Sequence, residues 1–209
     1  VYVATTHNFH HENMIQALSA GKHVLCEKPM ATRREDAERL FAEAKARGLF
    51  LMEGMWSRFL PNSLRAKEWI ETGRIGAVKF IDAMFSFAVD PRLPKRRLVD
   101  PALGGGAMFD LGVYTVEMAS YYAGADPMEW SGFCDPFCPG TDATAAMALQ
   151  YPGGVLATLR MGITCEAPVM MTVYGEKGRI ELPRFFVANE ARLYEGELLA
   201  AQEVQRFEL

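Results

Sequence analysis

The sequence predicts two structural units: a parallel α/β unit at the N-terminus, followed by an α+β unit built on an open, mainly antiparallel sheet. The first unit is indicated by short apolar runs that alternate with amphipathic segments up to about residue 60. The second is indicated by the β-rich runs after Pro61 and by the turn signals Pro152-Gly153-Gly154 and Gly175-Glu176-Lys177-Gly178. We therefore divide the chain into two domains, residues 1–58 and residues 59–209.

The N-terminal unit alternates strands with helices. Short apolar runs predict strands over residues 1–4, 23–26 and 49–52. The helical segments between them are each followed by a glycine in the position of a C-terminal cap, Gly21 and Gly48. Thr32 and Glu35 have the spacing of a capping box, so we expect Thr32 to cap the second helix. This order of strands and helices is typical of a parallel sheet.

Polar side chains follow all the predicted strands of this unit. The strand ends carry Thr5-Thr6-His7, Glu27-Lys28-Pro29 and the segment from Glu53 to Trp56. Because ligands of parallel sheets bind outside the carboxyl ends of the strands, we expect these segments to open onto one crevice. A proline has no backbone N–H and pushes the residue before it toward an extended conformation. The sequence therefore predicts that Lys28 is held at a strand end and points into the crevice.

The C-terminal unit begins with a predicted helix that starts near Asn62 and ends at Gly73 or Gly76. β-Branched and aromatic residues predict a strand over residues 77–87, and a second helix runs roughly from Ala107 to Tyr122. Further strands are predicted at residues 144–151, 154–164, 169–175, 178–183 and 191–196. An antiparallel sheet with a helix on one face leaves its other face to be covered, often by a second subunit.

The composition excludes several classes of function. With 50% hydrophobic and 23% charged residues, the chain resembles an ordinary globular protein. A net charge of −4 argues against a nucleic-acid partner, and no apolar run is long enough to predict a membrane span. Four cysteines are too few for a disulfide framework, and Cys134 and Cys138 lack the further ligands of a metal site. We expect reduced thiols, a cytoplasmic protein and no metal.

The stretch GGGAMFDLGVYTVE, residues 104–117, holds the second group of candidate residues. Asp110 and Tyr114 are four apart and share one face of a helix, while the glycines let backbone approach a ligand closely. If an alcohol is oxidised by hydride transfer, its hydroxyl proton must leave for a base. A tyrosine can serve when a nearby cation lowers its pKa. We predict Tyr114 as general acid/base, Lys28 as the cation that lowers its pKa, and Asp110 as a positioning residue.

Each candidate also has an ordinary structural explanation. Aspartate and tyrosine at this spacing are common on amphipathic helices. His10 and His11 lie near a helix start, where they can cap the helix or face solvent, and Trp56 and Phe85 have the size of core residues. The basic run Lys95-Arg96-Arg97 is expected to be solvated. A lysine before a proline at a strand end is the most specific of these signals.

Four segments in one order carry a family resemblance: ATTHNFH after the first strand, then AGKHVLCEKPMA, then LFLMEGMWSRFLP, then GGGAMFDLGVY. Together they resemble the Gfo/Idh/MocA family of oxidoreductases, over nearly the whole chain. The segment MEGMWSRFLP and the tyrosine of DLGVY are most similar to the branch of dimeric dihydrodiol dehydrogenases and NADP-dependent D-xylose dehydrogenases. EKP alone is a weak signal, whereas four motifs in order are specific.

The resemblance implies a Rossmann domain, then an α/β domain whose open, mainly antiparallel sheet forms homodimers. It implies NADP, or NAD, as the cofactor and a sugar or cyclic trans-diol as the small-molecule substrate. The family's catalytic lysine, aspartate and proton-transferring residue match Lys28, Asp110 and Tyr114. Cofactor contacts match Thr5, Thr6, His7, His10, Glu27, Lys28, Pro29, Trp56 and Arg58. Substrate contacts match Trp56, Phe85, Asp110 and Tyr114. The bond before the EKP proline is often cis in this family, and a tyrosine in place of histidine disfavours inositol as substrate.

The chain departs from the family pattern at both ends. No G-x-G-x-x-G motif is present, so the resemblance places the N-terminal half of the Rossmann domain before Val1 and the family's closing helix after Leu209. We expect the chain to belong to a longer protein that is the enzyme, and to be poorly active alone. Three other hypotheses stay open: a non-catalytic relative that binds nucleotide or sugar, a structural dimerisation fragment, and a relative that reduces an imine.

Overall fold

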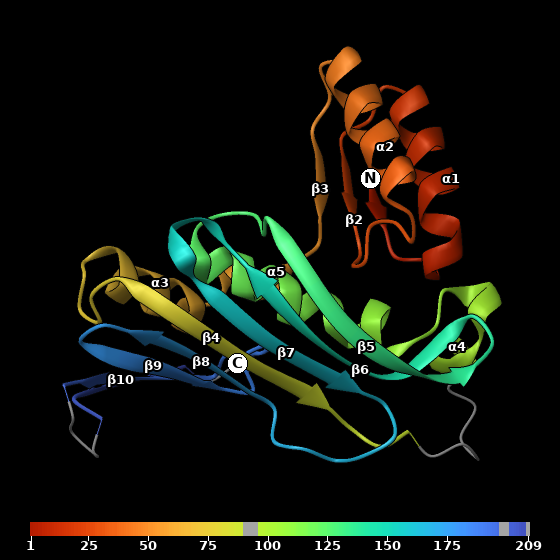
Figure 1. Cartoon of the computed structure of the whole chain (residues 1–209). Helices are drawn as coiled ribbons and strands as arrows, with labels where there is room; N and C mark the ends of the chain where they lie inside the picture. The colour runs from red at the N-terminus through yellow and green to blue at the C-terminus, as the bar shows by residue number, and fades with distance from the viewer. Residues whose placement is uncertain (90–95, 197–200, 208–209) are drawn as a thin grey trace.

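The structure is a computed structural model that describes residues 1–89, 96–196 and 201–207. The chain folds into a three-stranded and an eight-stranded sheet, and helices cover one face of each. The smaller sheet and its helices stand over the helix-covered side of the larger sheet (Figure 1). The order of the two units is therefore the one that the sequence predicts.

The smaller sheet is parallel, with the strand order β1-β2-β3 that the alternating pattern predicts. Its short strands are β1 (Tyr2–Val3), β2 (Val24–Cys26) and β3 (Leu51–Glu53). Helices α1 (His7–Ser19) and α2 (Arg34–Ala46) cover one face. Apolar side chains of the two helices pack against alternate strand residues and form the core of this unit.

The ends of these helices confirm one prediction and contradict another. Gly21 and Gly48 have φ angles of +70° and +64°, the left-handed conformation with which a glycine ends a helix. The predicted capping box is wrong, because α2 begins one residue after Arg33, which is the N-cap and makes no side-chain cap bond. Thr32 instead lies beside Gly104, where an added Cβ would be 3.3 Å from the threonine methyl carbon.

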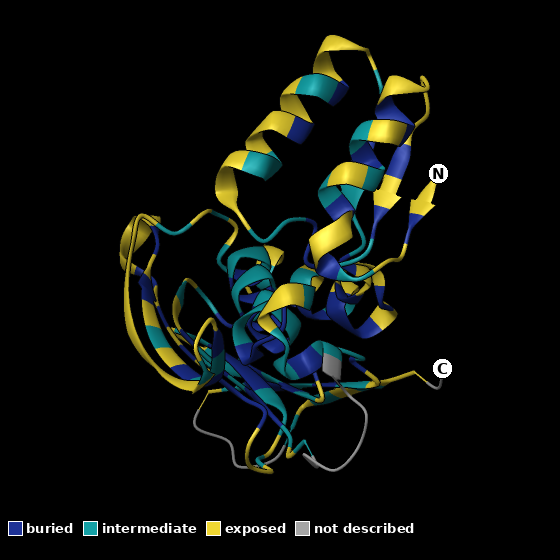
Figure 2. Cartoon of the chain, turned by 90° about the vertical axis from the view of Figure 1, so that its right-hand side faces the viewer, coloured by how far each residue is buried: buried dark blue, intermediate teal, exposed yellow. Residues whose placement is uncertain are grey.

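The larger sheet has the strand order β11-β10-β9-β8-β4-β7-β6-β5. Its strands are β4 (Val78–Ser86), β5 (Glu129–Cys138), β6 (Thr141–Gln150), β7 (Leu156–Gly162), β8 (Met170–Gly175), β9 (Gly178–Pro183), β10 (Glu190–Glu195) and β11 (Glu203–Arg206). β4 and β7 are parallel and the other neighbours are antiparallel, so the sheet is mainly antiparallel, as expected. Helices α3 (Pro61–Glu71) and α5 (Val113–Ala123) pack on one face, and buried residues gather where helices face the sheet (Figure 2).

Two strands of this sheet, β5 and β11, lie outside the strands that the sequence predicts. β5 contains Gly132 and Pro136, and its pairing with β6 shifts register at Pro136. Almost every residue of β5 is exposed, and β5 is one of the two edge strands of the sheet. Within sheets, proline and glycine occur mainly at such edges and bulges. Gly132 and Pro136 interrupt the alternating pattern that predicts a strand, so β5 was not predicted.

The face of the large sheet that is turned away from the helices carries exposed apolar side chains. Phe80 of β4 lies beside Leu156 of β7, and Phe133 of β5 lies beside Ala146 of β6. Phe80, Leu156 and Phe133 are 55%, 44% and 89% exposed. We call this surface, which also includes Asp82, the open face.

Short helical turns connect the main elements: η1 (Trp56–Phe59), α4 (Arg96–Val99), η2 (Pro101–Leu103), η3 (Met108–Gly112) and η4 (Pro152–Gly154). η3 is a π-helical turn that leads directly into α5. The helix predicted from residue 107 to 122 is therefore confirmed, but with a wider first turn. Such π-helical turns are rare and frequently mark functional sites.

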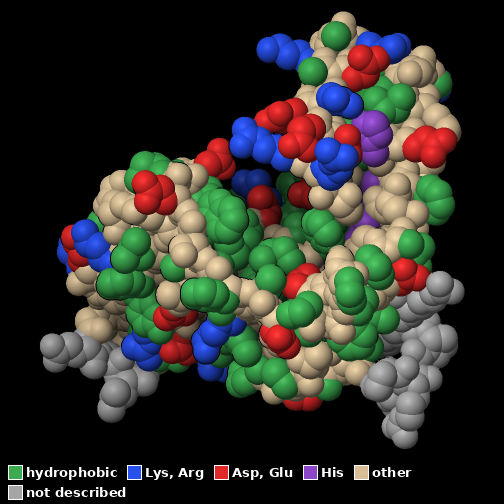
Figure 3. Space-filling view, turned by 45° about the vertical axis from the view of Figure 1, so that its right-hand side comes forward, with side chains coloured by type: hydrophobic (Ala, Val, Ile, Leu, Met, Phe, Trp, Pro, Cys, Tyr) green, Lys and Arg blue, Asp and Glu red, His purple; other side chains and the backbone are tan. Residues whose placement is uncertain are grey.

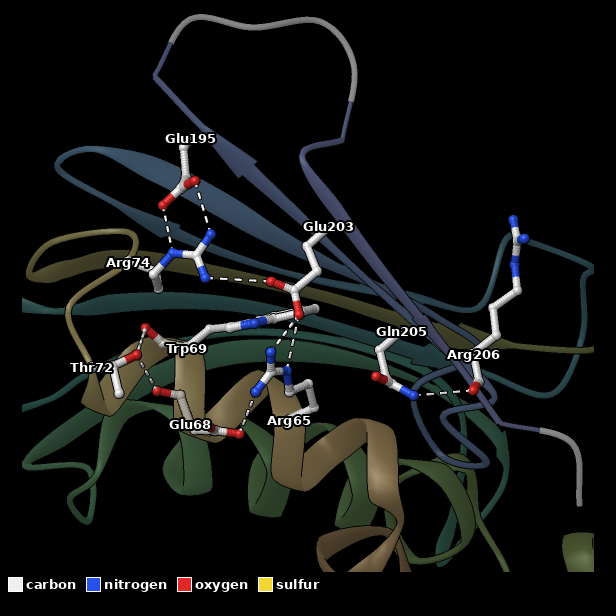
Figure 4. A network of polar contacts seen from close by, with 9 residues as sticks. All are labelled: Arg65, Glu68, Trp69, Thr72, Arg74, Glu195, Glu203, Gln205 and Arg206. Atoms are coloured by element: carbon white, nitrogen blue, oxygen red, sulfur yellow. Dashed lines mark hydrogen bonds and ion pairs between the residues drawn. The ribbon is translucent and has the colours of Figure 1, made fainter.

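A network of ion pairs ties α3 to the last strands of the sheet (Figure 4). Arg65 pairs with Glu68 of its own helix and with Glu203 of β11. Arg74, which follows α3, pairs with Glu195 at 2.6 Å and with Glu203 at 3.3 Å. Partly exposed pairs contribute little one by one, so the network mainly fixes where β10 and β11 lie.

Candidate functional site

Lys28 follows β2 and reaches across to the second unit. Its Nζ donates to the main-chain oxygen of Asp110 at 2.8 Å and to Oδ1 of the same residue at 3.3 Å. Nζ also lies 4.6 Å from the centre of the Tyr114 ring. Only 13% of the Lys28 side chain is exposed. The prediction that Lys28 points into a crevice at the strand ends is confirmed, and the bond between Lys28 and Pro29 is cis.

The segment around Lys28 is held from two sides. On one side, Nδ1 of the fully buried His10 lies 2.8 Å from the main-chain oxygen of Pro29. On the other, Glu53 at the end of β3 accepts a hydrogen bond of 2.6 Å from the backbone N–H of Met30. Burial raises the pKa of Glu53, although this hydrogen bond opposes the rise. Both contacts fix the backbone immediately after Lys28, and so they determine where the ammonium group lies.

Asp110 lies in the π-helical turn η3, whose N-terminal end is capped by a distant residue. Oδ2 of Asp142, at the start of β6, accepts from the backbone N–H of Met108 at 2.8 Å. Gly106 precedes this turn with a φ of +122°, and a Cβ added there would lie 2.3 Å from Oδ1 of Asp142. A glycine is therefore required at this position so that the carboxylate can reach the free N–H groups at the helix start.

The carboxylate of Asp110 pairs with two cations. Its Oδ1 lies 3.3 Å from Lys28 Nζ and 3.0 Å from Nη1 of Arg97. Burial by itself raises the pKa of Asp110, but the two cations outweigh it and hold the pKa below its usual value. Burial lowers the pKa of Lys28, and Asp110 opposes that change. The expected role of Asp110 in orienting Lys28 agrees with this geometry.

Arg97 was expected to be part of a solvated basic run; its side chain is 42% exposed, but it also forms an ion pair with Asp110 that the sequence did not predict. Its guanidinium faces the cleft and binds Asp110. Lys95 and the side chain of Arg96 lie outside what the structure describes. Nothing in the local sequence separates an arginine that turns inward from its basic neighbours, so only the fold reveals it.

Tyr114, in the first turn of α5, is 7% exposed. Its hydroxyl oxygen accepts a hydrogen bond of 3.0 Å from Nε1 of Trp56. Burial raises the pKa of Tyr114, the Trp56 hydrogen bond opposes this, and Asp110 adds to it. The expectation that Lys28 lowers this pKa is therefore wrong for this structure. Lys28 lies over the ring face as a cation–π contact and donates its hydrogen bonds to Asp110 instead.

Lys28, Asp110 and Arg97 border a cleft of about 460 Å³ at the carboxyl ends of β1 and β2. Figure 3 shows a recess between the two units, with acidic and basic side chains in and around it. Its lining includes most of the residues that the sequence proposed for the cofactor: Thr5, Thr6, His7, His10, Glu27 and Lys28, together with Asp110 and Arg97. Nδ1 of His7 lies 2.8 Å from the main-chain oxygen of Gly104, which connects the strand end to the glycine segment.

Several predicted site residues do not line this cleft: Pro29, Trp56, Arg58, Phe85 and Tyr114. Trp56 lines a neighbouring pocket with Gly54 and Met55, so the end of β3 does not open onto the same cleft as the ends of β1 and β2, contrary to the expectation of one crevice. Arg58 pairs with Glu117 at 2.8 Å and lies over the ring of Tyr121. Phe85 is buried, 4.5 Å from the ring centre of Phe186 in a stacked arrangement. The ring of Phe85 packs against that of Tyr114, with ring centres 5.8 Å apart, and Phe85 does not line the cleft.

The sequence did not predict that Arg97 and Asp142 belong to the site. It also did not predict that Glu53 binds the backbone N–H of Met30. Only Glu53 carried a usable signal, because it ends the third predicted strand beside the other polar strand ends. Within the described residues, no three His, Cys, Asp or Glu side chains group as metal ligands. All the cysteines are free thiols.

Two family models match the chain. The model of the Gfo/Idh/MocA C-terminal domain matches residues 63–181, and that of the oxidoreductase family with an NAD-binding Rossmann fold matches residues 1–55. The chain belongs to the Gfo/Idh/MocA oxidoreductase family. The smaller unit is thus the Rossmann part, and the larger unit is the family's C-terminal α/β domain with its mainly antiparallel mixed sheet.

Relatives with known activities resemble the chain over most of its length. The trans-1,2-dihydrobenzene-1,2-diol dehydrogenase of Sus scrofa is 35% identical over 182 residues, which is 87% of this chain and 53% of the relative. The enzyme of Macaca fascicularis is 37% identical over 87% of this chain and 54% of its own length. The chain therefore spans little more than half of the length of these relatives.

Solved structures show the same fold. The aldose-aldose oxidoreductase of Caulobacter crescentus, complexed with glycerol, superposes with a TM-score of 0.87 at 29% identity, over 97% of this chain and 62% of its own. A 3-ketoreductase of Actinomadura kijaniata, in complex with NADP and TDP-benzene, superposes with a TM-score of 0.82 at 29% identity, over 99% of this chain and 63% of its own. Among the described residues of this chain, no helix combines the length and apolarity needed to cross a bilayer.

Proposed function

We propose that this chain carries the substrate-side catalytic groups of an NADP-dependent dehydrogenase that acts on a hydroxyl group of a sugar or cyclic trans-diol. The observation that carries the proposal is the meeting of Lys28, Asp110 and Tyr114 at the carboxyl end of the parallel sheet. The likeness to diol dehydrogenases and to sugar oxidoreductases supports the substrate class, and the NADP complex of the 3-ketoreductase supports the cofactor.

The cleft has the chemistry that a nicotinamide requires at its reactive end. A nicotinamide cofactor, when bound, supplies the hydride acceptor or donor. Thr5, Thr6 and His7 offer polar atoms at the strand end, and Lys28 adds a buried cation beside them. The sequence contains no G-x-G-x-x-G motif, so the residues present fit the nicotinamide end and not the pyrophosphate.

The proton is handled by Tyr114 in this proposal. With its pKa raised, Tyr114 is a neutral hydroxyl at neutral pH, suited to give its proton to a carbonyl oxygen during reduction. In the oxidising direction Tyr114 must first lose its proton; its phenolate, stabilised by the Trp56 N–H, then takes the proton of the alcohol and becomes a neutral hydroxyl again. Lys28, held by Asp110, supplies positive charge to the substrate oxygen.

The test uses the natural full-length protein that contains this chain. Reduction of NADP⁺ and NAD⁺ is followed by absorbance with a panel of aldoses and trans-dihydrodiols. Tyr114→Phe should lower kcat by roughly 10²–10⁴-fold and leave cofactor affinity nearly unchanged. Tyr121→Phe, on the same helix, keeps the ring that Arg58 contacts and serves as the matched control. Tight cofactor binding without turnover on any substrate would instead favour a non-catalytic sensor.

Three further features belong to this proposal. The open face, with its exposed Phe80 and Phe133, supports a homodimer formed through that surface. We assign residues 1–58 and 59–209 to the two domains, and the turn η1 (Trp56–Phe59) lies at the boundary between them. The free thiols of all cysteines support a reducing compartment such as the cytoplasm.

A further inference from the structure

Arg97 is the second cation of the cleft, and the activity proposed above assigns it no function. Its guanidinium lies 3.0 Å from Oδ1 of Asp110, closer than the 3.3 Å of Lys28 Nζ to the same atom. The side chain of Asp110 is 13% exposed, whereas that of Arg97 is 42% exposed. Arg97 therefore approaches the buried carboxylate from the solvent side. It belongs to the C-terminal unit, whereas Lys28 belongs to the Rossmann part.

The backbone of Arg97 is held against the glycine segment. The N–H of Gly106 donates to the main-chain oxygen of Leu98 at 2.9 Å, and that of Gly105 donates to Asp100 at 3.0 Å. A Cβ added to Gly105 would lie 2.9 Å from the main-chain oxygen of Arg97. The glycine is thus needed for the close approach of the two segments, and this approach places the arginine beside Asp110.

The two cations share the carboxylate unequally. An ammonium group has three N–H donors, and among the residues that the structure describes, Lys28 directs hydrogen bonds only to the main-chain oxygen and Oδ1 of Asp110. Its shorter bond goes to the main-chain oxygen, while Arg97 takes the shorter bond to Oδ1. Without Arg97, Lys28 would be the sole partner of a buried carboxylate and would be drawn into a tight pair with it.

We propose that Arg97 is a positioning residue that neutralises the Asp110 carboxylate and thereby leaves the Lys28 ammonium available to the substrate oxygen. This inference rests on the proposed dehydrogenase function for its kinetic consequence only. The placement of the Arg97 cation in the cleft, beside Asp110, does not depend on any reaction. In agreement with it, the charge of Arg97 opposes protonation of both Lys28 and His7.

The kinetic test compares Arg97→Gln, Arg97→Lys and the control Arg34→Gln in the full-length enzyme. Arg34 is an exposed arginine of α2 that pairs with Glu38. Arg97→Gln should lower kcat by about 10–10²-fold, with the KM for the cofactor changed by less than about threefold. Arg97→Lys should restore most of the loss, because it keeps the charge. An Arg97→Gln enzyme with wild-type kcat, or an Arg97→Lys enzyme as poor as Arg97→Gln, would overturn the proposal.

A second measurement does not depend on turnover. The ring of His7 faces the main-chain oxygen of Gly104 and the charged or titratable groups of His10, Arg97 and Asp110. Its titration is followed by NMR in the full-length enzyme, where the signal of His7 is the one that is lost in a His7→Gln variant. Loss of the Arg97 cation should move this titration to higher pH, and Arg97→Lys should not. An unmoved titration in Arg97→Gln would refute the placement of Arg97, whereas a moved titration in a protein without any turnover would refute only the proposed function.

Discussion

The indole N–H of Trp56 should control the acidity of Tyr114. The bond from Nε1 of Trp56 to the tyrosine oxygen is 3.0 Å long and opposes the rise in pKa that burial causes. Trp56→Phe keeps an aromatic ring of nearly the same position but removes the donor. A hydrogen bond to a charged oxygen contributes about 1.5–3 kcal/mol. Because Trp56 is 40% exposed, we expect the lower end of this range.

The expected result is a higher pKa for Tyr114 in Trp56→Phe, together with a loss of about tenfold in kcat for alcohol oxidation, since 1.36 kcal/mol is a factor of ten in rate. The pKa is measured by ultraviolet absorbance titration, with the Tyr114→Phe protein subtracted to remove the other tyrosines. Trp130→Phe, on the exposed edge strand β5, is the matched control. The reasoning fails if Trp56→Phe titrates like the wild type, or if Trp130→Phe shifts the curve as much.

Three other outcomes are expected. In urea denaturation, Gly106→Ala should lower the free energy of unfolding by roughly 1–3 kcal/mol more than Gly154→Ala does. Both glycines have a positive φ, but only a Cβ on Gly106 would meet Asp142. Equal losses in the two variants would contradict this steric argument. Burial lowers the pKa of His7, so the native state binds its proton less readily than the unfolded chain does. The free energy of unfolding should therefore fall as pH drops from about 6.5 through the lower pKa of the folded state, and His7→Gln should flatten that dependence; an unchanged slope would contradict it. Phe133→Glu on the open face should convert the proposed dimer to a monomer in size-exclusion chromatography, and a variant that still elutes as a dimer would count against this face.

Much of the fold was predictable because its signals are local. The alternation of apolar runs and helical segments determined the parallel sheet, and Gly21 and Gly48 marked the helix ends through their left-handed φ. The edge strand β5 was not predictable, since Pro136 and Gly132 break the pattern and its stability comes from pairing with β6. The start of α2 was misplaced because Thr32 packs beside the glycine segment instead of capping the helix.

The sequence by itself determined the chemical types of the site: a lysine before a proline at a strand end, and an aspartate and a tyrosine on one helical face. Only the tertiary structure decided how they act together. Lys28 and Asp110 are 82 residues apart, and whether the lysine meets the tyrosine at its hydroxyl or over its ring depends on how the two units pack. The ion pair of Arg97 with Asp110 and the raised pKa of Tyr114 also depend on the fold. Burial raises that pKa and long-range packing makes that ion pair, and neither is a property of a local stretch of sequence.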